Sequence, residues 1–317
     1  MYRNRHMRQA EQQGGKSLLL GTGVLLLLVL PVISFADVRI TLNNTFIEKY
    51  KNRATIDATY TVDMAHKKPN LPTNDGDLHI AGRAPEIGLP TVAEIMNAAS
   101  QQQAVDLIHS AEGTGNPVKV SGAWRLWSEH GGTSDQVQGK ALQPFDTTNP
   151  PHVFEIHPVT RIQDLNLAGS LKPIEGYSPK DAHDAFTNYE NKRCKVIPGT
   201  KTTTIITPMA GYNYVEFLME IQDDKQLELA DGRIVAASVL ESEGELLVQA
   251  CRMIFIKDTP PEEAVIGLKK GDRLHVLGIP RIDLSNISWR IKNYKTKPDV
   301  LNRDLPYEII IVGVYKD

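Results

Sequence analysis

The chain has 317 residues, of which 41% are hydrophobic and 23% are charged. This composition excludes a disordered or fibrous chain and gives enough length for about two domains. The formal net charge of −3 lacks the basic excess that general nucleic-acid binding requires.

The N-terminal segment, residues 1–36, is predicted to be a signal peptide. Basic residues precede the apolar run Leu18 to Ile33, and the small residues Ser34 and Ala36 then fit a cleavage site. Cleavage would leave a periplasmic or secreted protein without membrane contact. The alternative is an uncleaved single anchor, since the run with its flanks approaches the length of a bilayer span. Pro31 favours cleavage, because proline breaks the helix just before the small residues.

Residues 37–166 are predicted to form the first domain. Thr91 followed by Glu94 has the spacing of a capping box, which predicts a helix from there to about His109. Strands are predicted where apolar and polar residues alternate or where an apolar face is evident. The predicted strands are Ala54 to Met64, Asp77 to Gly82, Val118 to Leu126 and the stretch HVFEIHPVTRI, His152 to Ile162.

Residues 167–209 are predicted to be a linker that contains several Pro and Gly, with a possible short helix over Pro179 to Tyr189. Residues 210–317 are predicted to form a second domain of three strands, a short helix and two strands. That order is typical of an OB-type Greek-key barrel. The predicted strands are Tyr214 to Ile221, Gly232 to Leu240, Glu245 to Ile256, Arg273 to Ile279 and Tyr307 to Tyr315, and the helix is Thr259 to Leu268.

The second half resembles an OB-fold domain in its strand order, in its helix position and in the segment Lys269 to Gly278. The first half resembles a family of exported bacterial proteins of unestablished activity, which share an Asp-x-His strand and a Glu-(Leu/Ile)-His-Pro-Val strand. The matching segments are GDLHI, VKVSGAWRLW and FEIHPV. The resemblance implies a mainly β protein with short helices and two OB-like barrels. The long loop that contains His130 departs from the compact His-Gly turn of that family, so no role is carried over to His130.

Glu155 and His157 are predicted to share one face of a strand, and if the strand of Asp77 and His79 lies near it, four side chains of metal-ligating type share that face: Asp77, His79, Glu155 and His157. Carboxylate and imidazole groups suit zinc or another divalent transition ion. The opposing interpretation is that these are ordinary solvated polar pairs on the outer face of strands, or that they make a hydrogen bond that fixes a turn. Neither His-x-x-x-His nor Cys-x-x-Cys spacing supports a metal. We therefore expect no cofactor, with a divalent metal as the alternative.

A basic loop over Ile287 to Lys297 is the second candidate site, because OB barrels often bind oligonucleotides or oligosaccharides through their loops. The alternative is a solvated basic hairpin. The candidate ligand-binding residues are Trp289, Arg290, Lys292, Tyr294 and Lys295.

Cys194 and Cys251 could form one disulfide in an oxidising compartment, or they could be two separate buried thiols. The chain has no Gly-x-Ser-x-Gly elbow and no Walker or dinucleotide-binding motif.

The favoured function is that of an exported, non-catalytic binding or scaffolding protein with an unknown ligand or protein partner. One alternative is a metal-dependent hydrolase of phosphoesters that uses the four ligand-type residues. The other is a membrane-anchored component of cell-envelope assembly.

Overall fold

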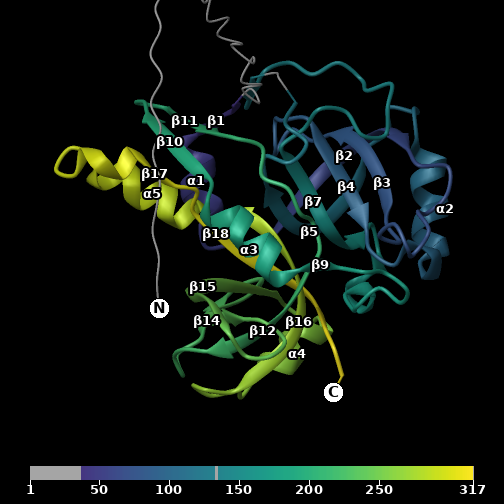
Figure 1. Ribbon diagram of the computed structural model, residues 1–317. Helices are drawn as coiled ribbons and strands as arrows, with labels where there is room; N and C mark the ends of the chain where they lie inside the picture. Colours follow the sequence, from purple (N-terminus) through teal and green to yellow (C-terminus); the bar gives the residue numbers. More distant parts are fainter. Residues whose placement is uncertain (1–36, 133–134, 317) are drawn as a thin grey trace, which may run out of the picture. The chain divides into compact units, whose positions relative to one another are not determined.

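The computed structural model describes residues 37–132 and 135–316 (Figure 1). The predicted signal peptide, residues 1–36, lies outside the described residues. Within the described ranges, no helix is long and apolar enough to cross a membrane. The fold is mainly β, as predicted, and contains two closed five-stranded barrels and one open sheet.

The first barrel closes through the pairings β2–β3, β3–β4, β4–β7, β7–β5 and β5–β2. The β4–β7 pair is parallel and the other four are antiparallel. Helix α2 (Gln102–Ala111) connects the third and fourth strands, which is the OB arrangement. The strands are β2 (Thr55–Ala65), β3 (Leu78–Arg83), β4 (Thr91–Ile95), β5 (Val118–Leu126) and β7 (Phe154–Ile162).

The second barrel repeats this topology, again with one parallel pair between its third and fifth strands. Its helix α4 (Pro260–Val265) begins after Thr259, whose side chain accepts a hydrogen bond from the amide of Glu262. The two-barrel prediction is therefore confirmed. The strands are β12 (Val215–Ile221), β14 (Gly232–Leu240), β15 (Leu246–Ile256), β16 (Arg273–Ile282) and β18 (Tyr307–Val314).

The open sheet has the strand order β17-β10-β11-β1-β6 and was not predicted (Figure 1). Its strands come from the first domain, the linker and the second domain as predicted from the sequence. Its strands are β17 (Asn302–Asp304), β10 (Arg193–Pro198), β11 (Thr202–Thr207), β1 (Val38–Asn43) and β6 (Gln136–Val137).

The interval 167–209, predicted to be a linker, contributes regular structure to the fold. It contains β9 (Lys180–Asp181), α3 (Ala182–Glu190), β10 and β11. Alternating buried residues such as Val196 and Ile205 form these strands, while Pro198 and Gly199 only mark the turn between them. Shorter elements are α1 (Asn44–Tyr50), α5 (Leu284–Asn293), β8 (Leu165–Asn166), β13 (Leu227–Leu229) and the 3₁₀ turns Ala98–Ser100, Ala168–Ser170 and Pro298–Leu301.

The helix predicted from Thr91 is wrong in its first half. Thr91–Ile95 is the fully buried strand β4, and the Thr91 hydroxyl donates to the carbonyl of Leu89 instead of capping a helix. A short apolar run bounded by turn residues fits a buried strand as well as a helix, and barrel closure decides in favour of the strand. The helix itself begins only at Gln102.

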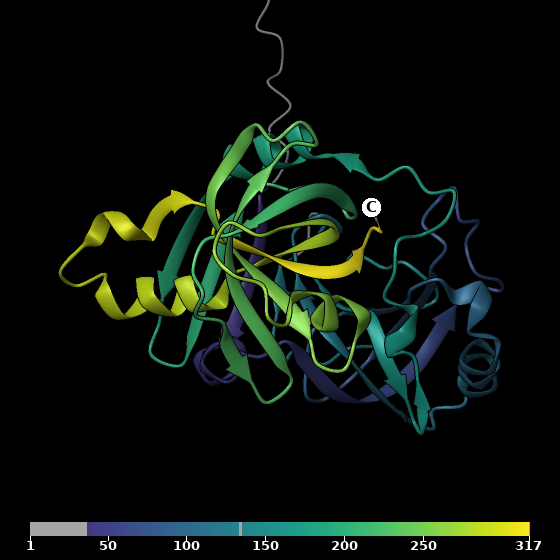
Figure 2. The ribbon, with the colours of Figure 1, turned by 90° about the horizontal axis from the view of Figure 1, so that it is seen from below.

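The predicted loop over Ile287 to Lys297 is also wrong, because most of it belongs to helix α5. Asp283 caps this helix, and its carboxylate accepts hydrogen bonds from the amides of Ser285 and Asn286. Figure 2 shows α5 in yellow beside the barrels.

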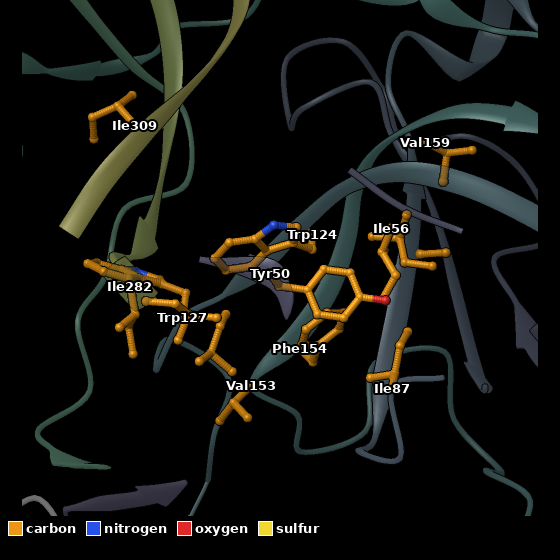
Figure 3. Packing of buried hydrophobic residues seen from close by; sticks show 14 of the residues in the cluster. Tyr50, Ile56, Ile87, Trp124, Trp127, Val153, Phe154, Val159, Ile282 and Ile309 are labelled. Atoms are coloured by element: carbon orange, nitrogen blue, oxygen red, sulfur yellow. The ribbon is translucent and has the colours of Figure 1, made fainter. Parts of the chain in front are cut away.

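The hydrophobic core follows the predicted strand faces. Leu78, Ile80, Phe154 and Ile156 are all buried in one cluster. That cluster also holds large side chains from both barrels, among them Trp124 and the β16 residue Ile282 (Figure 3). Burial of this apolar surface is the main force that holds the described unit together.

Two arginines connect the barrels reciprocally. In the first barrel Arg125 pairs across the strands with Glu155, and in the second Arg281 pairs with Glu308. The Nε of Arg125 donates to the carbonyl of Pro280 at 3.0 Å. An Nη1 of Arg281 donates in turn to the carbonyl of Trp124 at 3.1 Å. Each guanidinium thus bonds to the residue before the other arginine.

Candidate functional site

The structure brings three of the four predicted ligand-type residues into contact around His157. Its Nε2 lies 3.3 Å from Asp77 Oδ2, and its Nδ1 lies 3.4 Å from Glu155 Oε2. His79 lies at the margin, where its Nε2 is 3.8 Å from Asp75 and 3.7 Å from Glu94. The strand periodicity therefore placed Glu155 and His157 together correctly and Asp77 beside them.

Glu94 is a central residue of this cluster that the sequence reasoning missed. It is the cross-strand partner of His79, and the Ala93–Ile156 register sets it beside His157. The Oε2 of Glu94 lies 3.2 Å from the Nδ1 of His157. The capping-box interpretation assigned Glu94 to a helix. The signal that could have found it is the alternation in which Glu94 lies between the apolar Ala93 and Ile95.

Tyr214 completes the cluster from the residue before β12, in the second half of the chain. Its hydroxyl donates to Asp77 Oδ2 at 2.6 Å and lies 2.8 Å from His157 Nε2. These bonds tie the first barrel to the start of the second. From the sequence, Tyr214 was predicted only as the start of a strand.

Arg125 holds Glu155 in place. An Nη1 of Arg125 donates to Glu155 at 2.6 Å, and its Nη2 donates to Glu129 at 3.0 Å. The Nε2 of His152 lies 3.3 Å from the second oxygen of Glu155. Both oxygens of Glu155 therefore make hydrogen bonds. Asp77 and Glu94 differ, because each has one oxygen that makes no hydrogen bond within the described residues.

The expectation that these polar residues are solvated is wrong. Asp77 and His157 are 0% exposed, and Glu94 and Glu155 are 2% and 3% exposed. The outer face of the first barrel is covered here by Tyr214 and by the arginine junction. Because buried charge requires compensation, the protonation of this cluster depends on its internal contacts.

The pKa directions identify His157 as the cation of the apo cluster. Burial opposes its charge, but Glu94 and Asp77 raise the pKa of His157 well above its ordinary value. Burial raises the pKa of Asp77 to about 6, although His157 partly offsets this. Burial also opposes ionisation of Glu155, yet Arg125 keeps the pKa of Glu155 well below its usual range. The cluster therefore holds several buried groups with shifted pKa values close together.

A pocket of about 380 Å³ lies against the cluster. Glu94 and Tyr214 belong to the cluster and also line the pocket. Asp77 and His157 do not line the pocket and lie buried behind its wall. Burial disfavours the charge of His79, but Glu94 and Asp75 raise the pKa of His79 to about 9. Other lining residues include Asp75, His79, Glu129, His130, Tyr177 and Tyr212.

Three residues could hold a metal ion among those described. Donor atoms of Asp77, Glu94 and His157 all lie within 4.8 Å of one another. Asp77 Oδ1 and Glu94 Oε2 are buried and make no hydrogen bond within the described residues. Two carboxylates and an imidazole are a donor set suited to divalent transition ions.

Of the residues predicted to bind ligand near Trp289, Arg290 is not available at the surface. Trp289 is 42% exposed, but Arg290 is buried and donates to the carbonyl of Asp304. Lys292 pairs with Glu48 at 3.0 Å, while Tyr294 and Lys295 follow the end of α5.

Cys194 and Cys251 are both free thiols and both are buried. Burial raises the pKa of Cys194 to about 11 and also raises the pKa of Cys251. Neither cysteine therefore has the lowered pKa of a nucleophilic thiol.

No family model matches the chain, and no curated protein matches it. Among solved structures, it is similar to the single-stranded DNA binding protein from Thermus aquaticus, with 10% identity and a TM-score of 0.22 over 83% of this chain and 91% of that chain. A deletion mutant of the same protein gives 10% identity and a TM-score of 0.22, over 83% of this chain and 93% of the other. Likeness of this degree establishes neither a shared fold nor a shared ligand.

Proposed function

We propose that this protein is an exported, non-catalytic binding protein whose ligand occupies the pocket beside the acid–imidazole cluster. The observation that carries the proposal is the composition of that pocket. Half-buried tyrosines line it together with carboxylates and imidazoles, which gives flat apolar surface and many hydrogen-bonding groups in one cavity. Such a mixture suits a short polyhydroxylated ligand, an oligosaccharide, which stacks on aromatic rings and bonds through its hydroxyl groups.

The charges of the lining support a neutral or cationic ligand over a nucleic acid. Asp75, Glu94 and Glu129 contribute carboxylates, which repel phosphate. Lys180 also lines the pocket, but its ammonium group lies 3.0 Å from Asp184 and 4.8 Å from the centre of the Tyr212 ring. A phosphate group would therefore compete with existing contacts of Lys180.

The proposal of export is supported by the N-terminal pattern of basic, apolar and small residues in residues 1–36. Binding is favoured over hydrolysis because Asp77 and His157 are fully buried behind the pocket wall. A hydrolytic metal needs an open position that a substrate can reach.

Calorimetric titration of the purified protein with short neutral oligosaccharides tests the proposal. We expect saturable binding that Tyr177→Ala weakens by about tenfold or more, since stacking on one ring contributes about 1–3 kcal/mol. Trp289→Ala is the matched control, because it removes an exposed aromatic residue outside this pocket. Tighter binding of single-stranded oligonucleotide, or loss of binding in Trp289→Ala alone, would contradict the assignment of this pocket.

A further inference from the structure

We propose that Asp77, Glu94 and His157 hold one divalent transition-metal ion, such as Zn²⁺ or Mn²⁺, directly behind the pocket. The metal site and the proposed function are linked through one residue, Glu94, which belongs to both the pocket and the metal site. The inference rests on the proposed function in this respect alone. The three residues come from the start of β3, from β4 and from β7, so the ion would join three strands of the first barrel.

The spacing of Glu94 and His157 fits two ligands of one ion. The Glu94 Oε2 and the His157 Nδ1 are 3.2 Å apart. Two donors that each lie about 2.1 Å from a tetrahedral ion are about 3.4 Å apart. Glu94 Oε2 makes no hydrogen bond within the described residues, so this spacing is available to two ligands of one ion.

Two buried carboxylate oxygens of this cluster make no hydrogen bond within the described residues, and the contacts of Glu94 Oε2 with His157 and His79 are ionic contacts at 3.2 and 3.7 Å. Asp77 Oδ1 belongs to a side chain that is 0% exposed, and Glu94 Oε2 belongs to one that is 2% exposed. Unpaired oxygens of buried carboxylates are rare in folded proteins, because desolvation without a partner is costly. A cation bound between them would satisfy both oxygens.

The remaining atoms of the same residues are already oriented as an outer shell. His157 Nε2 lies 2.8 Å from the Tyr214 hydroxyl, which donates to Asp77 Oδ2 at 2.6 Å. With Nε2 as the protonated nitrogen, His157 donates to Tyr214, and the lone pair of Nδ1 faces Glu94 Oε2 at 3.2 Å and Glu155 Oε2 at 3.4 Å, where a metal ion could take it up. Metal-binding histidines characteristically use their second nitrogen in this way. The same chain of bonds leaves Asp77 Oδ1 free.

The local charge also favours a cation. The cluster and the adjoining pocket contain five carboxylates: Asp75, Asp77, Glu94, Glu129 and Glu155. Arg125 pairs with Glu155 and Glu129, and His79 lies 3.8 Å from Asp75 and 3.7 Å from Glu94, so the carboxylates still outnumber these two cationic partners.

The ion would be structural. Asp77 and His157 are fully buried, and the outer shell of the ion would include Tyr214 from the second half of the chain. It would hold the junction of the barrels and fix Glu94 in the pocket wall. Occupancy should therefore stabilise the fold and order the pocket.

The test is titration of chelator-treated protein with ZnCl₂ or MnCl₂ alone, followed by calorimetry, elemental analysis and melting curves. We expect one ion per chain and a melting temperature that rises with metal concentration. Absence of a stoichiometric ion, together with an unchanged melting temperature, would overturn the proposal even if every variant failed to fold.

Glu94→Gln identifies the site, because it removes one donor charge without changing the shape of the side chain. We expect the metal affinity to fall by about tenfold or more. Glu129→Gln is the matched control, since it removes a carboxylate that also lines the pocket but bonds to Arg125. Equal metal affinity in Glu94→Gln and wild type would overturn the site.

Oligosaccharide titration with and without chelator separates the two proposals. Metal binding without oligosaccharide binding supports the metal site and contradicts the proposed function. Oligosaccharide binding to protein that takes up no metal supports the function and overturns the metal site.

Discussion

The two barrels carry the same buried Arg–Glu pair in different surroundings. In each barrel the arginine is the second-last residue of the fourth strand, and the glutamate is the second residue of the fifth strand. In the second barrel Glu308 receives Arg281 at 2.7 Å and Arg252 at 2.9 Å, and Arg281 also lies 3.6 Å from the Trp124 ring centre. Both oxygens of Glu308 are therefore bonded to arginine.

In the first barrel the equivalent Glu155 is also saturated, but the residues around it are not. Position 157, two residues after Glu155, is a histidine, whereas the position two residues after Glu308 is the apolar Ile310. His157 brings Asp77 and Glu94 together, and each keeps one buried oxygen without a hydrogen-bond partner within the described residues. The second barrel thus uses the pair for stability, and the first adds carboxylate oxygens without a hydrogen bond beside a pocket.

Glu308→Gln should break the saturated cluster most severely. Glu308 is 0% exposed, so loss of its charge leaves Arg281 and Arg252 without their buried counter-ion. We expect a loss of about 3–5 kcal/mol in the free energy of unfolding, measured by denaturant titration. A loss below about 1 kcal/mol would show that the second cluster is not the structural anchor that its contacts indicate.

Asp283 should give the second cluster a pH dependence. Burial and then the neighbouring Glu308 raise the pKa of Asp283 to about 6, above the unfolded value of about 3.9. The folded state therefore binds the extra proton, so this stability is complete below about pH 4 and is lost as pH rises through about 6. The expected change is about 2–3 kcal/mol.

Unfolding of wild type and Asp283→Asn between pH 4 and pH 7 tests this expectation. The asparagine still caps α5 but does not titrate, so the variant should lose this part of the pH dependence. Parallel stability curves for the two proteins would contradict the assigned pKa shift.

Tyr214→Phe should weaken the first cluster by less, about 1–2 kcal/mol in unfolding free energy. The substitution removes the hydroxyl that bonds to Asp77 and His157. These two residues lie only 3.3 Å apart and can still pair directly, which limits the loss. Tyr177→Phe is the control, and equal stability of the two variants would contradict the bridging role of Tyr214.

The sequence predicted the barrels well because strand alternation and turn residues are local signals. Ala54 to Met64 alternates cleanly and is β2, and the Thr259 cap with Pro260 correctly begins α4. The open sheet was not predicted, because β6 and β17 are only two and three residues long and pair with distant segments. Such pairings are decided by tertiary contacts, not by local pattern.

The candidate site was half predictable for the same reason. Alternation within one strand placed Glu155 and His157 together, but it could not show that Tyr214 would cover them. Glu94 was missed because Thr91 and Glu94 fit a capping box, while closure of the barrel requires β4 as its third strand. A local helix signal was overruled by the burial of an entire strand.

Glu94→Gln in metal-free protein should change the free energy of unfolding least. Its comparison with Glu308→Gln is the sharpest test of the difference between the two barrels. Glu94 Oε2 makes no hydrogen bond within the described residues, and Asp77 and Glu155 remain to accompany His157. We expect a change below about 1 kcal/mol in either direction, since removal of one of several crowded carboxylates also relieves repulsion. Saturating metal should then stabilise wild type but not the variant. A loss as large as that of Glu308→Gln would mean that Glu94, too, is a saturated structural charge, and that the two barrels do not differ.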